Sequence, residues 1–298
     1  MTNTTARTDV QQLVTDTIIQ QLEQGTIPWQ KPWNDNNPFS FSIPKNFVSG
    51  NHYRGINIVL LWAASLKNKY QSNEWASFKQ WAERKEYVRK GEKGNLIVYY
   101  DTFDRDVDGE IQKIPYLKSY YVFNKCQLQS YQPEEPLKDE PFNVFDFTTR
   151  IETVDEFVEN TQAIIESHDS GACYIPLQDK IMMPYRELFK NTATCTATEG
   201  FYSTLLHELT HWSGAKHRLD RTKGKKFGDN AYAFEELTAE FGAAFLCAEF
   251  GIGTLDKGDH AGYIENWLTA LKNDKTLLFT AASQASKAVD YLKALSPN

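Results

Sequence analysis

The spacing of apolar residues in the first half of the chain predicts three helices and a pair of strands. Leu13, Ile18 and Leu22 recur at helical spacing, and they are followed by Gly25, a residue type that commonly ends helices. We expect helices at about 8–24, 55–70 and 75–86, and strands at 95–103 and 116–128 on either side of a turn at 104–109. Together these elements predict a compact α+β module.

The second half is predicted to be mainly helical, with a small β-sheet. The apolar periodicity places helices at about 153–167, 198–214, 230–250, 259–272 and 276–294. Two short apolar segments between the first two helices, 172–176 and 180–184, are typical of a strand pair. Each contains a proline, which favours strand ends or sheet edges because proline cannot donate to the ladder. The whole chain is therefore expected to be an α+β protein of two domains.

The boundary between these domains is expected where composition and charge change. Residues 131–142 carry three prolines among several acidic side chains, a composition that disfavours a packed element. Residues 1–130 hold 16 Lys or Arg against 13 Asp or Glu, whereas residues 131–298 hold 16 against 26. A basic half fits a polyanionic partner, and an acidic half fits a metal site or simply solubility. We predict domains at 1–130 and 151–298, with a linker at 131–150.

Composition and the N-terminal residues predict a cytoplasmic protein without a membrane partner. Of the 298 residues, 41% are hydrophobic and 24% are charged, and no apolar run approaches the ~18 residues of a membrane span. The N-terminal residues lack the apolar segment of a secretory signal. The four cysteines lie far apart, which is typical of reduced thiols rather than of a disulfide framework.

The segment His207-Glu208-Leu209-Thr210-His211 gives the strongest chemical signal in the chain. Histidines four residues apart share one face of a helix and can chelate one ion, and imidazole suits Zn²⁺. Glu208 projects towards the open side of the metal, where a carboxylate can take a proton from bound water. We therefore predict one zinc ion per chain, held by His207 and His211, with Glu208 as the catalytic base of a peptidase. The alternative is a surface helix with two unrelated histidines.

A second helix rich in acidic residues supplies the candidates for a third ligand. The pattern formed by Glu236 and Glu240, which begins 25 residues after His211, resembles that of the glutamate zincins. That resemblance implies that Glu236 completes the metal site and that Glu240 hydrogen-bonds a ligand histidine from behind. The two roles can be exchanged, and Glu235 is a third candidate. All three carboxylates could instead be solvated, but the small residues 242–244 favour close helix packing.

Other residues of this half give weaker signals. His217 could line the cleft or polarise a carbonyl, although a surface position is the more common fate of such a histidine. Tyr232 could stabilise an oxyanion or simply pack. In a peptidase, the substrate would lie along an edge strand within residues 172–184.

Tryptophans and basic residues are concentrated together in the first half. Five of the seven tryptophans lie between positions 29 and 81, and residues 29–93 hold 11 basic side chains against 5 acidic ones. Single-stranded nucleic acid is bound by cationic grooves with aromatic platforms on which bases stack. Turns with glycine and lysine can hold phosphates. The alternative is that the tryptophans form the core and the basic residues form a solvated face. The candidate DNA-binding residues are Lys31, Arg54, Trp75, Lys79, Arg89, Lys90 and Lys93.

Over nearly its whole length the chain resembles the ArdC-type antirestriction proteins of conjugative plasmids. In the first half the resemblance rests on LEQGTIPWQKPW (22–33), YRGIN (53–57), WASFKQ (75–80) and VRKGEKG (88–94). In the second half it rests on HELTHWSG (207–214), RLDR (218–221) and EELTAE (235–240). The resemblance implies an N-terminal single-stranded-DNA-binding domain followed by a zincin-like metallopeptidase domain.

The resemblance also implies a biological role and partners. The implied role is protection of incoming plasmid DNA from host restriction enzymes. The implied ligand is chiefly single-stranded DNA, with double-stranded DNA as a second candidate. A component of a restriction system is a candidate protein substrate.

Three other functions are compatible with the residues alone. The first is a cytoplasmic zinc metallopeptidase whose N-terminal half recognises protein substrate rather than DNA. The second is a non-enzymatic binding protein in which the metal only supports structure. The third is DNA mimicry by acidic side chains, although the acidic residues form no long runs. Salt-dependent binding of a single strand separates the first of these from a DNA-binding protein.

Overall fold

The computed structural model describes residues 9–30, 41–107, 110–133, 148–192, 195–221, 230–253 and 260–296. The first half contains α1 (Val10–Glu23), β1 (Lys45–Asn46), α2 (Ile56–Asn68), β2 (Glu74–Ala76), α3 (Phe78–Glu83), β3 (Asn95–Val107), β4 (Glu110–Asn124) and the 3-10 turn η1 (Lys125–Gln127). The second half contains α4 (Glu152–Asn160), β5 (Ile164–His168), β6 (Cys173–Ile175), β7 (Lys180–Pro184), η2 (Arg186–Leu188), α5 (Ala197–Ser213), α6 (Asn230–Phe250), α7 (His260–Asn273) and α8 (Leu277–Ala294). The predicted α+β class with two domains is confirmed.

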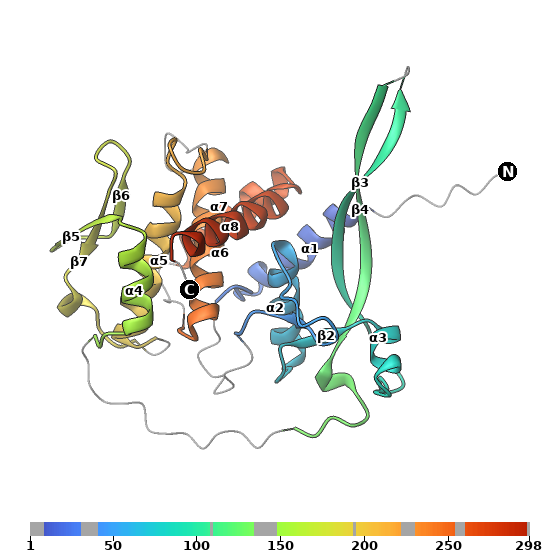
Figure 1. Ribbon diagram of the computed structural model, residues 1–298. Coiled ribbons are helices and arrows are strands. Elements are labelled where there is room, and N and C mark those ends of the chain that lie inside the picture. The colour runs from blue at the N-terminus through green and yellow to red at the C-terminus, as the bar shows by residue number, and fades with distance from the viewer. Residues whose placement is uncertain are drawn as a thin grey trace.

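A long antiparallel hairpin of β3 and β4 projects from the N-terminal sheet (Figure 1). The four strands of this sheet pair in the order β1-β2-β4-β3, and the hairpin register begins with Asn95 opposite Val122. Strand β3 is therefore an edge strand. The side chain of Asn57 in α2 covers part of that edge, because it bonds both the N–H and the carbonyl of Val98 at 2.8 Å. This contact anchors the base of the hairpin to α2.

Two elements of the first half differ from the sequence prediction. The helix expected at 75–86 is the strand β2 followed by the shorter helix α3. Trp75 pairs with both β1 and β4, and Ser77 then starts the helix by exchanging hydrogen bonds with Gln80. The turn expected at 104–109 is shorter than predicted, because β3 and β4 stay paired through most of it.

A three-stranded sheet in the order β5-β7-β6 forms the opposite end of the molecule. The strand pair predicted within 172–184 is confirmed. Pro184 is the last residue of β7, as expected for a proline. The helix predicted at 153–167 stops at Asn160, and the residues after it form β5, which pairs in parallel with β7. Gln162, with a φ of 59°, reverses the chain between the two elements. Strand β6 is thus left as an edge strand beside α5.

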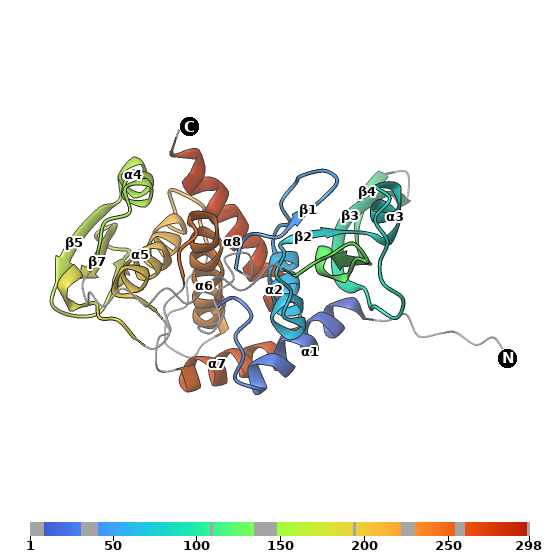
Figure 2. The ribbon, with the colours of Figure 1, turned by 90° about the horizontal axis from the view of Figure 1, so that it is seen from below.

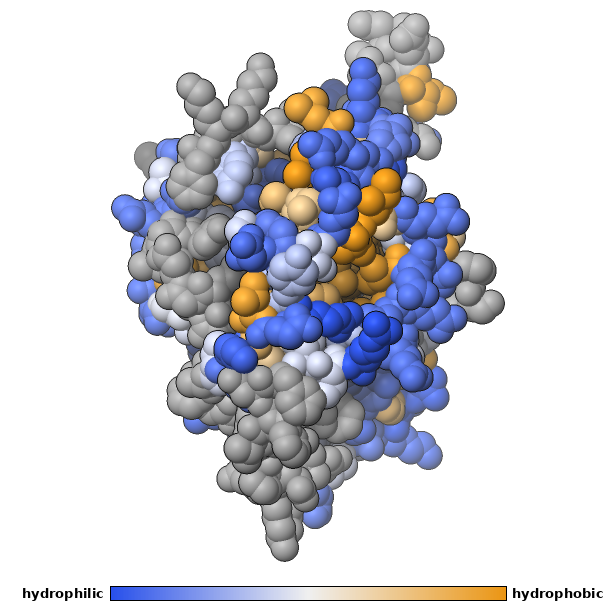
Figure 3. Space-filling model, turned by 90° about the vertical axis from the view of Figure 1, so that its left-hand side faces the viewer, coloured by the Kyte–Doolittle hydropathy of each residue, from blue (hydrophilic) through white to orange (hydrophobic). Residues whose placement is uncertain are grey.

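Figure 3 views the molecule from this end. Hydrophobic residues form a band there with hydrophilic residues on both sides. The exposed large hydrophobic residues of this sheet and the turns around it are Ile164, Leu177, Tyr185 and Leu188.

One hydrophobic core joins the two halves of the chain. The ring of Trp29 packs against Phe241 of α6 and Trp267 of α7, at centroid distances of 4.8 and 5.3 Å. Trp62 of α2 packs against Phe245 of α6 at 5.8 Å. Figure 2 shows α1 beside α7 and α2 beside α8, as this packing requires. The N-terminal module is therefore held directly against the helices of the second domain.

Residues 134–147, which make up most of the predicted linker at 131–150, lie outside the described residues. The domain limits of 1–130 and 151–298 stay predictions. Among the residues that the structure describes, none of the helices is both long enough and apolar enough for a bilayer crossing.

Replacing Trp29 by Ala should destabilise both halves together. This ring is fully buried, and removing such a side chain costs about 3–5 kcal/mol of unfolding free energy. Denaturant unfolding should show one cooperative transition with a lower midpoint. Leu177→Ala, at a side chain that is 99% exposed, is the matched control and should leave the midpoint unchanged. Two separate transitions, of which only one has a lower midpoint in the variant, would contradict the inference that both halves share one core.

Candidate metal centre

Helix α5 begins and ends at residues that suit helix ends. Thr196 and Glu199 form a capping box: the Thr196 hydroxyl accepts the Glu199 N–H at 3.1 Å, and the Glu199 carboxylate accepts the Thr196 N–H at 3.0 Å. Gly214 follows the last turn, where a side chain would overlap the guanidinium of Arg221. Most of the helix is buried. Its histidines are therefore carried by a rigid element.

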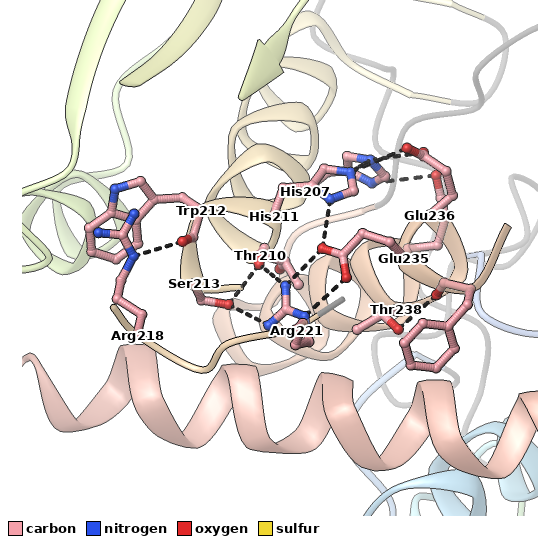
Figure 4. Close-up of polar contacts among 12 residues, drawn as sticks. His207, Thr210, His211, Trp212, Ser213, Arg218, Arg221, Glu235, Glu236 and Thr238 are labelled. Atoms are coloured by element: carbon pink, nitrogen blue, oxygen red, sulfur yellow. Dashed lines mark hydrogen bonds and ion pairs between the residues drawn. The ribbon is translucent and has the colours of Figure 1, made fainter. Parts of the chain in front are cut away.

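Helix α6 approaches α5 very closely. A Cβ atom at Gly242 would lie 2.5 Å from Cγ2 of Thr210, so only a residue without a side chain allows this contact. Leu237 and Phe241 are fully buried and fix the rotation of α6 about its own axis. With that rotation, Glu236 points from α6 towards the histidines of α5 (Figure 4).

The donor atoms of His207, His211 and Glu236 converge on one point (Figure 4). The Nε2 atoms of the two histidines lie 3.1 Å apart. One carboxylate oxygen of Glu236 lies 3.6 Å from Nε2 of His207, and the other lies 3.5 Å from Nε2 of His211. Ligands about 2.0–2.1 Å from a tetrahedral metal ion are separated from one another by roughly 3.3 Å. Among the described residues, these three form the group that could hold a divalent metal ion.

A buried ion pair supports His211 from behind. The Nδ1 atom of His211 lies 3.0 Å from Oε1 of Glu235, and Arg221 donates to both oxygens of that carboxylate at 3.0 and 3.1 Å. Arg221 also donates to the hydroxyl of Ser213 at 2.9 Å and to the carbonyl of Thr210. Its side chain is only 1% exposed. These contacts fix the tautomer and the orientation of the His211 ring.

The same contacts set the protonation of the metal-free site. Burial lowers the pKa of His211, but hydrogen bonds to Glu235 and Glu236 outweigh it and raise the pKa to about 9. Burial raises the pKa of Glu235, yet hydrogen bonds from His211 and Arg221 bring it below its ordinary value. Without metal, His211 therefore carries a proton at neutral pH, and a metal ion must displace that proton to bind.

His207 has a looser contact behind it. Its Nδ1 atom is buried without a hydrogen-bond partner, and Oε1 of the buried Glu240 lies 3.5 Å away. A shift of a few tenths of an ångström would turn this contact into a hydrogen bond. The role predicted for Glu240, behind a ligand histidine, fits this position and stays a prediction.

Glu208 of α5 lies on the side of the helix that is near the edge strand β6. Its side chain is buried, one position after His207 in the helix. Burial and the negative charge of Glu208 both raise the pKa of the Cys173 thiol on β6. The carboxylate therefore lies near Cys173 on an edge strand of the small sheet.

Two family models match separate parts of the chain. The N-terminal domain of the anti-restriction factor ArdC matches residues 8–123, and a zincin-like metallopeptidase matches residues 152–284. The metal-free crystal structure of an antirestriction ArdC protein from the R388 plasmid is 40% identical, with a TM-score of 0.79 over 97% of this chain and 98% of that one. The chain belongs to the ArdC antirestriction family. An Mn(II)-bound structure of the R388 protein is 39% identical, with a TM-score of 0.77 over 98% of this chain and 99% of that one.

Other relatives of this ArdC-family chain are of two kinds. A protein of Sinorhizobium fredii, named uncharacterized protein y4eC, is 36% identical over 96% of this chain and 92% of its own length. Two Escherichia coli proteins named DNA primase TraC are each 34% identical over most of this chain, which spans only 20% and 27% of their lengths. The primase activity of those longer proteins is not inferred for this chain.

Five of the residues predicted to bind DNA are exposed in this ArdC-family structure, among them Lys79, Lys90 and Lys93. Lys79 pairs only loosely with Glu83, at 3.8 Å between largely exposed side chains. Such a contact contributes little to stability and leaves the ammonium available for a phosphate. Lys31 lies outside the described residues.

Two of the predicted arginines are engaged within the fold. Arg54 forms a two-pronged ion pair with Asp290 of α8. Arg89 donates to backbone carbonyls within residues 126–128 and to the carboxylate of Glu92. Phosphates would have to compete with these contacts, so a role for either arginine in DNA binding stays a prediction.

The prediction that Trp75 contacts DNA is wrong. Its side chain is completely buried in a small cluster with Leu61 and Val122, and its ring meets that of Tyr70 edge-on. Strand β2 is a central strand between β1 and β4, and the Trp75 side chain has no exposed surface. For this tryptophan the alternative prediction, a place in the core, is the correct one.

His217 lies with a cluster at the β6–β7 turn rather than with the metal donors. Its Nε2 atom is 3.1 Å from Asp179, which also pairs with Arg218, and the Arg218 guanidinium stacks on Trp212 at 3.6 Å from the ring centroid. The hydrogen bond from Arg218 lowers the pKa of Asp179 to about 2. The cluster fastens the small sheet to the end of α5. Tyr232 is half-buried in the first turn of α6, and its role stays a prediction.

Arg221 was not among the predicted site residues. A single basic residue after a helix carries no sign that it is buried. The signal in the sequence was Glu235, the third candidate carboxylate. If its side chain was not solvated, it needed a basic partner. The basic segment 218–221, directly after the histidine helix, was the nearest source of one.

Removing the ion pair behind His211 should weaken metal binding without unfolding the protein. Glu235→Gln combined with Arg221→Met removes both buried charges together, so neither is left unpaired. We expect metal affinity, measured by competition with a chromophoric chelator, to fall roughly 10–100-fold. The matched control, Asp290→Asn with Arg54→Met, removes an exposed pair on the far side of the core. An unchanged affinity in the first double variant would show that this pair does not orient His211.

Proposed function

We propose that this ArdC-family protein binds single-stranded DNA, protects incoming DNA from host restriction, and holds one zinc ion per chain in a peptidase site. The observation that carries the proposal is the convergence of His207, His211 and Glu236. It occurs in a chain that is 40% identical to an antirestriction protein along nearly all of its length. Because restriction enzymes act on DNA that has entered the cell, the proposed place of action is the cytoplasm.

The donor set favours zinc. Two imidazoles and one carboxylate form a common catalytic zinc set, which leaves one position open. A zinc ion held there would supply an activated water and polarise a substrate carbonyl. The carboxylate of Glu208 would accept a proton from the attacking water and pass it to the leaving amine. The unpaired edge of β6 offers backbone groups to an extended peptide beside Glu208.

The DNA-binding part of the proposal is supported by Lys79, Lys90 and Lys93. Their side chains are exposed on α3 and on the turn before β3. Double-stranded DNA, which carries the same phosphate charges, is a second candidate ligand. A component of a restriction system is the candidate substrate of the Glu208 site.

Glu208→Gln should retain metal but lose hydrolysis. The amide keeps the size of the side chain and cannot accept a proton, so we expect peptide cleavage to fall by roughly 10²–10⁴-fold. Elemental analysis should still find one zinc per chain. Glu159→Gln, at an exposed glutamate of α4, is the control and should cleave as wild type does. Cleavage by Glu208→Gln at the wild-type rate would exclude the proposed role, and a wild-type protein without bound zinc would exclude the metal.

Replacing Lys79, Lys90 and Lys93 by Ala should weaken single-strand binding most at low salt. Each phosphate contact contributes about 0.7 to the slope of log K against log salt, so the slope should fall by about 2. Fluorescence anisotropy with a labelled oligothymidylate measures it. Exposed lysines of the second domain provide the control triple: Lys216, Lys272 and Lys287. If the wild type binds no single strand at low salt, DNA binding is excluded and protein recognition by the N-terminal half is favoured.

A further inference from the structure

Exposed aromatic rings are concentrated on the N-terminal module. Of the eight exposed aromatic side chains among the described residues, seven precede position 122. They are phenylalanines and tyrosines, whereas Trp29, Trp62, Trp75 and Trp81 are fully buried. Among the described residues, a surface for stacking bases would therefore consist of phenylalanines and tyrosines rather than tryptophans.

Two of these exposed rings, those of Phe78 and Tyr121, flank the half-buried ring of Phe123, and the three together form an aromatic strip. The rings of Phe78 and Phe123 meet edge to face, with centroids 6.0 Å apart. Phe123 and Tyr121 are alternate residues of β4 and so share one face of the hairpin. Both lie against Gly94, where an added Cβ would come within 2.8 Å of Cβ in Tyr121 and 3.2 Å of Cζ in Phe123. The missing side chain at Gly94 makes room for the strip.

The strip is open to solvent. Phe78 is 59% exposed and Tyr121 is 57% exposed. Phe78 is the first residue of α3, directly after the Ser77 cap, so the helix does not need this ring to form. Adjacent exposed rings on a rigid strand and helix offer flat apolar faces that the fold itself leaves uncovered.

Cationic side chains flank the aromatic strip. Lys79 follows Phe78 in α3, and Lys93 directly precedes Gly94. Lys90 lies in the same turn as Lys93. The acidic residue of this turn, Glu92, is bound by Arg89 and by the Gln127 amide, so its charge is already neutralised within the fold. The segments next to Phe78 and Gly94 therefore supply three exposed lysines.

We propose that bases of single-stranded DNA stack on the aromatic strip while Lys79, Lys90 and Lys93 contact its phosphates. This inference rests on the DNA binding proposed above and names the surface that performs it. A single strand fits because its bases expose their faces, whereas the bases of a duplex are stacked on one another.

The outer part of the hairpin is less suited to DNA. Tyr99 and Tyr120 form a second exposed pair there, with ring centroids 6.4 Å apart. Farther along the hairpin, however, residues 101–110 hold five acidic residues against one basic residue, a balance that disfavours phosphates. Charge thus favours binding of the DNA strand at the base of the hairpin. Tyr99, farther along the same hairpin, provides a control.

The test replaces each ring by leucine, which keeps an apolar side chain but has no aromatic face. Phe78→Leu and Tyr121→Leu should each weaken binding of a labelled oligothymidylate by roughly five- to 100-fold in fluorescence anisotropy. Phe78→Tyr should restore binding. Tyr99→Leu should bind as wild type does. Thermal unfolding checks that all the variants are folded.

An abasic strand of the same length separates stacking from charge. It should bind the wild type at least as weakly as the normal strand binds Phe78→Leu, because it cannot stack on any ring of the strip. The affinity for the abasic strand should be the same in Phe78→Leu as in the wild type. If the wild type and the strip variants bind oligothymidylate equally well, the proposed stacking on the aromatic strip is wrong, while the proposed DNA binding stands. An equal loss in Tyr99→Leu would also overturn the proposed stacking. If the wild type itself binds no strand, the proposed function fails first.

Discussion

The metal centre depends on the close contact between α5 and α6 at Thr210 and Gly242. A side chain at Gly242 would overlap Thr210, so a larger residue would push the helices apart. Donor atoms that share a tetrahedral ion are separated by roughly 3.3 Å, which leaves little tolerance for such a movement. The contact also lets successive carboxylates of α6 serve different partners. Glu236 faces the metal donors, while Glu235 faces the back of His211.

Helix α6 also links the metal centre to the N-terminal module. The face of α6 opposite the carboxylates carries Phe241 and Phe245, which pack against Trp29 and Trp62 of the first half. One helix thus contributes a metal donor and part of the core that both halves share. The proposed DNA surface and the proposed peptidase site are therefore held on one packed body, so a bound DNA strand would have a defined position relative to Glu208.

The sequence predicted what depends on local spacing. Periodicity located α5 to α8 to within a few residues, and the histidine spacing together with Glu236 indicated the donors that the fold brings together. It failed where partners distant in the chain decide the outcome. Strand β2 looked helical because its pairing with β4 cannot be read locally. The same holds for the burial of Trp75 and Arg221, and for the exposure of Tyr121.

X-ray absorption at the zinc edge of the zinc-loaded protein tests the central claim, that His207, His211 and Glu236 share one metal ion. The donor triangle predicts only nitrogen and oxygen ligands at about 2.0–2.2 Å, with the multiple-scattering pattern of two imidazoles. A sulfur ligand at about 2.3 Å would instead place a cysteine such as Cys173 on the metal. That result, or a signal from fewer than two imidazoles, would contradict the proposed centre.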